Sequence, residues 1–77
     1  MKRLGTVRRI AGNLLVLTAA DPDHPPIGTT AIDESLATVG RVVDVFGPVE
    51  EPYLAVSPDA DTADPALVGA TLYWRAE

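Results

Sequence analysis

Glycine and proline are spread along the whole chain and divide it into short apolar runs. The sequence of 77 residues contains six glycines and seven prolines. Proline lacks the amide hydrogen that a helix interior needs, and glycine lowers the stability of a helix. The runs between them are rich in valine, isoleucine and threonine, which suit the pleated surface of a strand. We therefore predict an all-β protein with no substantial helix.

Six of these runs have the composition of strands and are separated by turn signals. Gly12-Asn13, between the first two runs, is typical of a hairpin turn. Many short strands with frequent turns are typical of a small barrel, and closure removes the exposed edges that promote aggregation. We predict one domain over residues 1–77, a closed or nearly closed six-stranded antiparallel barrel whose third strand lies at an edge. The expected strands are residues 4–11, 14–20, 28–32, 37–46, 53–56 and 70–75.

The chain is acidic, with 11 acidic residues, six basic residues and a formal net charge of −5. Contacts to phosphate require clustered lysine and arginine. The excess of acidic residues therefore argues against this chain as the main nucleic-acid-binding component of a complex. Arg8 and Arg9 are consecutive in an expected strand and should point to opposite faces, so they predict no basic stripe. The acidity is typical of proteins from salt-loving microbes, because concentrated salt screens the repulsion between surface charges.

The sequence contains no cysteine, which excludes disulfides and zinc–thiolate sites and fits a reducing compartment. No stretch approaches the roughly 18 apolar residues of a membrane-spanning helix. Residues 2–20 resemble a signal peptide in having basic residues before an apolar run. Gly12-Asn13 interrupts that run, however, and two expected strands lie within it. We therefore expect a cytoplasmic protein that does not bind a membrane.

Residues suited to catalysis or metal binding are few. His24 is the only histidine and lies in a proline-rich loop, so we expect a solvated side chain rather than a metal ligand. Residues 59–64 resemble the start of a calcium loop without its glycine and final glutamate, which predicts a solvated acidic loop or a weak cation site. Glu50-Glu51 is a candidate carboxylate pair, but neighbouring side chains at a turn point apart. We expect no catalytic residue, no cofactor, no metal and no small-molecule substrate.

Residues 39–56 are the most distinctive stretch of the chain. A long β-branched run is followed by the turn Gly47-Pro48 and a second apolar run. Turns are usually polar, yet Phe46, Val49 and Tyr53 surround this one. Large apolar side chains at a turn either fold beneath it or are offered to a partner.

The same stretch resembles the signature of the Gar family, the small β-barrel subunit of H/ACA ribonucleoproteins, which is related to the Naf assembly factor. The signature is V-G-x-V-x-D-V-F-G-P-V-x-x-P-Y-x-x-V, and residues 39–56 fill nearly every fixed position. Residues 1–7, 30–36 and 68–73 resemble other strands and turns of the family, so the resemblance covers nearly the whole chain. The acidity and the absence of glycine/arginine-rich tails indicate an archaeal member.

The resemblance implies a non-catalytic subunit that docks on the catalytic domain of a guide-directed pseudouridine synthase of the dyskerin/TruB type. Such subunits bias the thumb loop of the enzyme, which aids substrate loading and product release in ribosomal RNA pseudouridylation. They meet the guide RNA only indirectly, through the complex. Three residues are expected to support the site: Gly40 by close backbone approach, Asp44 by hydrogen bonds that hold the turn, and Val42. The expected docking residues are Val45, Phe46, Gly47, Pro48, Val49, Pro52 and Tyr53.

Other interpretations of the same residues stay open at this point. Val42, Val45 and Phe46 are also of the type that simply fills a barrel. Small barrels often hold RNA, so direct RNA binding is the second function hypothesis, which gel shifts with guide RNA across a salt series would test. A flavin-binding barrel from an enzyme is the third, and absorbance of the purified protein in the flavin bands would reveal it.

Overall fold

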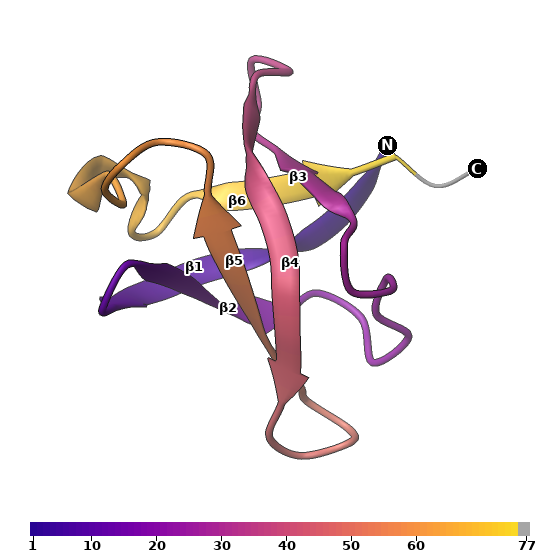
Figure 1. Ribbon diagram of the computed structural model, residues 1–77. Coiled ribbons are helices and arrows are strands. Elements are labelled where there is room, and N and C mark those ends of the chain that lie inside the picture. Colours follow the sequence, from indigo (N-terminus) through magenta and orange to yellow (C-terminus); the bar gives the residue numbers. More distant parts are fainter. Residues whose placement is uncertain (76–77) are drawn as a thin grey trace.

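Six strands form a closed antiparallel barrel, so the prediction of a small all-β barrel is confirmed (Figure 1). The computed structural model describes residues 1–75. Around the barrel the strand order is β1-β2-β5-β4-β3-β6, and every neighbouring pair is antiparallel. The strands are β1 (Lys2–Ala11), β2 (Leu14–Ala19), β3 (Thr30–Ile32), β4 (Thr38–Phe46), β5 (Tyr53–Pro58) and β6 (Thr71–Trp74).

The interior of the barrel is filled by aliphatic side chains from all six strands. Successive side chains of a strand face opposite sides, so alternate residues of β2 and β5 point into the barrel. No buried side-chain nitrogen or oxygen among residues 1–75 lacks a hydrogen-bond partner, so polar groups do not disturb this core. The buried core consists of Leu4, Val7, Leu15, Leu17, Ala31, Val42, Leu54, Val56 and Leu72.

The third strand is not an edge strand, contrary to the expectation from sequence. β3 pairs with β4 on one side and with β6 on the other, through Ile32 and Tyr73. Only three residues form the strand, but Gly28 and Thr29 extend the pairing, because the Gly28 amide donates to Val42 and the Val42 amide donates to Thr29. The barrel closes through the short pairing of β3 with β6, and so short a pairing produces no recognisable pattern in the sequence.

The fifth strand is two residues longer than expected and ends at Pro58. The Asp59 amide then donates to the Val39 carbonyl at 2.9 Å, which continues the pairing of β5 with β4. The acidic loop that follows is held by Asn13, from the β1–β2 turn. Its Nδ2 donates to the carbonyl of Asp61 at 3.2 Å, and its Oδ1 accepts from the amide of Ala63 at 2.8 Å. Two turns distant in sequence are thereby joined.

A single 3₁₀ turn, η1 (Pro65–Leu67), is the only helical segment among residues 1–75. Asp64 precedes it, and its carboxylate accepts from the Ala66 amide at 2.9 Å. Proline suits the first position of such a turn, because the amide it lacks would be unpaired there. Within the described part of the chain, no helix is long and apolar enough to cross a membrane.

The turn between β3 and β4 is organised by one carboxylate. Asp33 accepts hydrogen bonds from the Ser35 hydroxyl at 2.7 Å, the Ser35 amide at 2.8 Å and the Ala37 amide at 3.1 Å. These bonds favour the charged carboxylate, the Ser35 hydroxyl most of all, and hold the pKa of Asp33 below its ordinary value.

The lowered pKa predicts an acid-sensitive turn. The folded pKa lies below the unfolded one, so the contribution of Asp33 to stability is present above the unfolded pKa and is lost as the pH falls through the folded pKa. A carboxyl NMR titration should place the Asp33 pKa below about 3.9, the ordinary value of an aspartate. Ser35→Ala should raise the pKa toward that value, because it removes the strongest donor. An ordinary Asp33 pKa in the unaltered protein would contradict this role.

Candidate functional site

The segment that joins β4 to β5 projects from one end of the barrel (Figure 1). We call residues 46–53 the corner. Val49 at its tip is 88% exposed, the largest exposed fraction among the large hydrophobic residues of the described chain, and Pro48 beside it is also exposed. Phe46 and Tyr53 remain 41% and 39% exposed. These four apolar residues are therefore not folded beneath the turn.

The two aromatic residues of the corner form one unit. Phe46 ends β4 and lies directly opposite Tyr53, the first residue of β5. Their rings stack with centroids 5.6 Å apart and planes inclined by 26°. Gly47 has φ of +87°, and a Cβ there would lie 2.7 Å from Cδ2 of Tyr53. Glycine is thus required both for the backbone conformation and for the space that the Tyr53 ring occupies.

Two of the expected docking residues hold the corner from within. Pro52 is buried, and its carbonyl accepts from the Ala19 amide of β2 at 3.0 Å. Val45 is half-buried and packs against the core. That both also contact a partner stays a prediction, and both line the small hollow beside the corner. Their role is to attach the corner to the barrel.

The three expected supporting residues lie along β4. Val42 is only 1% exposed and fills the barrel, as one interpretation of the sequence allowed. Gly40 faces β5 so closely that a Cβ there would overlap the Ser57 carbonyl oxygen and lie 2.8 Å from Cα of Pro58. Asp44 is exposed, and its carboxylate accepts from the amide of Val45 at 2.8 Å. That bond lies at a bulge in β4, so it shapes the strand that leads into the corner rather than the turn itself.

The proline-rich loop lies beside the corner, which the sequence does not indicate. Pro22 and His24 line a small hollow together with residues of the corner and with Val45. His24 is exposed, as expected. Its Nδ1 lies 2.9 Å from the carbonyl oxygen of Pro25 and is the donor of this hydrogen bond, since a carbonyl can only accept. Among residues 1–75, no group of three or more His, Cys, Asp or Glu residues could hold a metal ion. The acidic residues of the loop 59–64 therefore form no such group either.

The expected separation of Arg8 and Arg9 is wrong. The register between β1 and β2 shifts at this point, with Val7 opposite Leu17 and Arg9 opposite Val16. A bulge places two successive residues against one on the partner strand, so the alternation of faces fails. Both arginines are exposed, and both line one open hollow with Val16, Thr18, Phe46 and Tyr53, which we call the outer groove.

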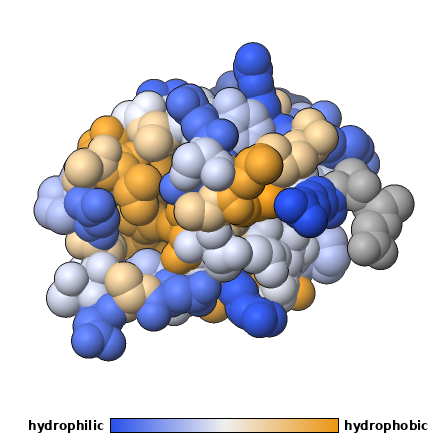
Figure 2. Space-filling view, turned by 90° about the horizontal axis from the view of Figure 1, so that it is seen from above, coloured by the Kyte–Doolittle hydropathy of each residue, from blue (hydrophilic) through white to orange (hydrophobic). Residues whose placement is uncertain are grey.

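Other surface features carry less chemistry. Figure 2 shows hydrophobic residues gathered on part of the end opposite the corner, so projection rather than apolarity alone distinguishes the corner.

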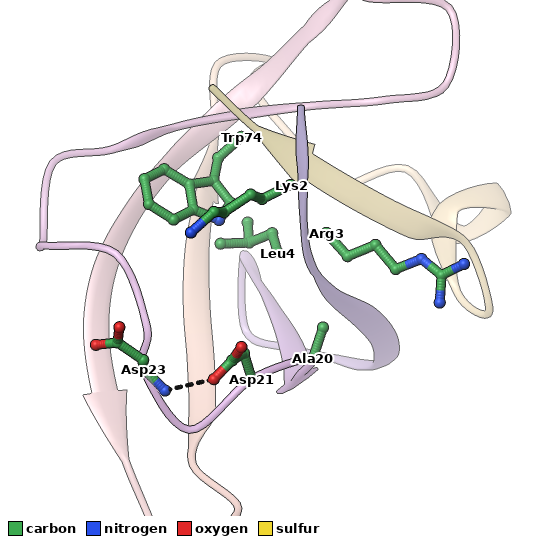
Figure 3. Close-up of a pocket in the computed structure, with 7 residues that line it drawn as sticks. All are labelled: Lys2, Arg3, Leu4, Ala20, Asp21, Asp23 and Trp74. Carbon is green, nitrogen blue, oxygen red and sulfur yellow. Dashed lines mark hydrogen bonds between the residues drawn. The ribbon is translucent and has the colours of Figure 1, made fainter. Parts of the chain in front are cut away.

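Figure 3 shows a cleft where Lys2 lies near Trp74, with Nζ 5.7 Å from the ring centroid. The Asp23 amide donates to the Asp21 carboxylate at 2.9 Å on the other side of this cleft. Its mixed charges select no ligand.

Comparison with known proteins supplies one match. A family model described as "Gar1/Naf1 RNA binding region" matches residues 1–77. No curated protein matches the chain significantly. The matched region includes the whole barrel, the corner and the outer groove.

Proposed function

We propose that this chain, which belongs to the Gar1/Naf1 family of RNA-binding proteins, is a non-catalytic core subunit of an archaeal H/ACA guide ribonucleoprotein. Members of this family are accessory components of H/ACA-related ribonucleoproteins rather than enzymes. In this role it binds the catalytic domain of a pseudouridine synthase of the dyskerin/TruB type. The docking aids substrate loading and product release during pseudouridylation of ribosomal RNA. The uridine chemistry belongs to the synthase.

One observation carries the proposal: the corner presents its largest apolar groups to solvent. Val49 and Pro48 form the exposed tip, and the stacked pair of Phe46 and Tyr53 forms its base. Charged residues border this apolar projection: Glu50 and Glu51 beside the tip, and Arg8 and Arg9 beside the aromatic pair. Interfaces combine apolar and aromatic centres with polar rims. A partner that covers the corner removes this apolar surface from water.

The charge at the corner predicts the character of the opposing surface. Glu50 and Glu51 are both exposed and immediately follow Val49. An apolar pocket for Val49 with basic residues at its rim would complement this pattern. The two carboxylates then fix the orientation of docking, while the buried apolar contacts supply most of the affinity.

Reconstituted turnover tests the proposed function. With guide RNA and excess substrate RNA, the multiple-turnover rate of the synthase should rise when this subunit is added, because product release becomes faster. The single-turnover rate at saturating substrate should change much less. Val49→Asp should behave as if the subunit were omitted, and Val43→Asp, at an exposed position of β4 outside the corner, should behave as the unaltered subunit. Equal multiple-turnover rates with and without the subunit would refute the proposal.

A further inference from the structure

The two ends of the outer groove differ in chemical character. Arg8 and Arg9 of β1 line one end, and the stacked rings of Phe46 and Tyr53 line the other. The strand order β1-β2-β5-β4 places both ends on neighbouring strands of one continuous sheet. A ligand that fills the groove must therefore offer an anion to the first end and an apolar group to the second.

The arginine end of the groove is ordered and carries an uncompensated positive charge. Nε of Arg8 donates to Oγ1 of Thr18 at 3.0 Å, which holds the guanidinium group beside β2. Its two terminal NH₂ groups carry the remaining N–H donors, in a planar fork that matches a carboxylate. Among residues 1–75, no acidic residue lines this groove. A carboxylate from a partner would therefore complement the two arginines.

The aromatic end of the groove suits proline. Phe46 is 41% exposed and Tyr53 is 39% exposed, so both rings offer surface to a ligand. Proline-rich segments dock in grooves lined by aromatic rings, and their polyproline II conformation is largely formed before binding, which lowers the entropic cost. The backbone carbonyls of such a segment are unpaired, and the Tyr53 hydroxyl can donate to one of them.

The separation of the two ends matches one turn of a polyproline II helix. Arg8 is held beside Thr18 of β2, and Phe46 lies in β4, two strands further on. Two strand spacings amount to about 9.6 Å. A polyproline II helix rises about 9.3 Å in a turn of about three residues, so its side chains at positions i and i+3 share one face. An acidic residue followed by a proline at i+3 can therefore reach both ends at once.

We propose that the outer groove binds an acidic, proline-containing segment of another protein in the polyproline II conformation. Its carboxylate contacts Arg8 and Arg9, and its proline rings pack on Phe46 and Tyr53. The net charge of −5 opposes a polyphosphate, whose charge continues beyond the groove, whereas a peptide confines its charge to the arginine end. This second contact does not depend on the proposed synthase docking, because the arginines line the groove alone and Val49 lines only the hollow beside the corner.

Fluorescence anisotropy of the free subunit with a labelled peptide of about eight residues, with the core Asp-Ala-Ala-Pro-Pro, tests the proposal. Arg8→Gln combined with Arg9→Gln should weaken binding about tenfold at about 0.1 M salt, because two exposed ion pairs are lost. Tyr53→Leu should weaken it about fivefold through lost contact with proline. Circular dichroism verifies that each variant is folded.

Changes in the peptide test the individual contacts. Asparagine in place of the aspartate should weaken binding to the unaltered subunit about tenfold and should change nothing for the Arg8 and Arg9 double variant, because both changes remove the same ion pairs. A peptide with the aspartate next to the first proline should bind as weakly as the asparagine peptide, because its two groups no longer span one turn of the helix.

The matched control removes the same charge elsewhere. Arg41 and Arg75 are exposed and lie outside the groove, so their combined change to glutamine should weaken binding by less than about twofold. Equal losses from the two double variants, equal affinities for the aspartate and asparagine peptides, or no binding at about 1 mM peptide would overturn the proposal. Tighter binding of an oligouridylate of the same length would overturn it as well. Val49→Ser should weaken synthase docking and leave peptide binding unchanged, so failure of either surface is recognised separately.

Discussion

Gly40→Ala should destabilise the barrel by about 3 kcal/mol. This is the largest loss of stability that we predict for a conservative substitution in this chain. A Cβ at this position would overlap the Ser57 carbonyl oxygen and approach Cα of Pro58 to 2.8 Å. These are backbone atoms of β5 and cannot rotate away as a side chain can. The sheet must separate locally, and the adjoining backbone hydrogen bonds between β4 and β5 weaken with it.

Thermal unfolding followed by circular dichroism measures this effect. A loss of about 3 kcal/mol corresponds to a fall in Tm of roughly 15 °C for a domain of this size. Arg41→Ala is the control, because Arg41 is the next residue of β4, is exposed, and should change stability by no more than about 0.5 kcal/mol. A Gly40→Ala variant as stable as Arg41→Ala would show that β4 and β5 are not so closely apposed.

Val49→Asp and Tyr53→Ala should each weaken binding to the synthase catalytic domain by about 30-fold or more, which corresponds to about 2 kcal/mol. Val49 contributes its methyl groups at the tip, and a carboxylate there would be buried without a partner in the complex. Tyr53 contributes an aromatic ring at the base. Calorimetric titration of each variant with the purified catalytic domain measures the change.

The two variants differ in what they do to the free subunit. Val49 is 88% exposed, so its replacement should leave the Tm nearly unchanged. Tyr53→Ala also removes the stack with Phe46, which costs about 1 kcal/mol of stability. Val49→Asp is therefore the cleaner test, with Val43→Asp as a control of the same chemistry at another exposed position of β4. Equal affinities for Val49→Asp and Val43→Asp would remove the corner from the interface.

The strands could be predicted from sequence because their signals are local. Breakers end each run within a few residues of the observed strand ends, and Gly12-Asn13 forms the expected two-residue turn between Ala11 and Leu14. Features that depend on partner strands could not be predicted. The closure of β3 against Tyr73 and the extension of β5 to Pro58 both depend on what lies opposite.

The candidate site shows the same division. An apolar turn predicts either burial or a contact surface, and only the structure shows that Val49 is exposed while Pro52 is buried. The position of the proline-rich loop beside the corner requires the complete fold. The outer groove was missed for a specific reason: strict alternation assigns Arg8 and Arg9 to opposite faces, and a bulge in β1 cancels that alternation. Two consecutive arginines in a strand do not reveal a bulge by themselves.

Hydrogen–deuterium exchange of the subunit with and without the synthase catalytic domain tests the central claim most directly. If the corner is the docking surface, the amides of Gly47, Val49, Glu50 and Glu51 should exchange more slowly in the complex. Those of the β1–β2 turn, Gly12 and Asn13, should be unaffected. Unchanged exchange at the corner, with protection elsewhere on the barrel, would contradict the account.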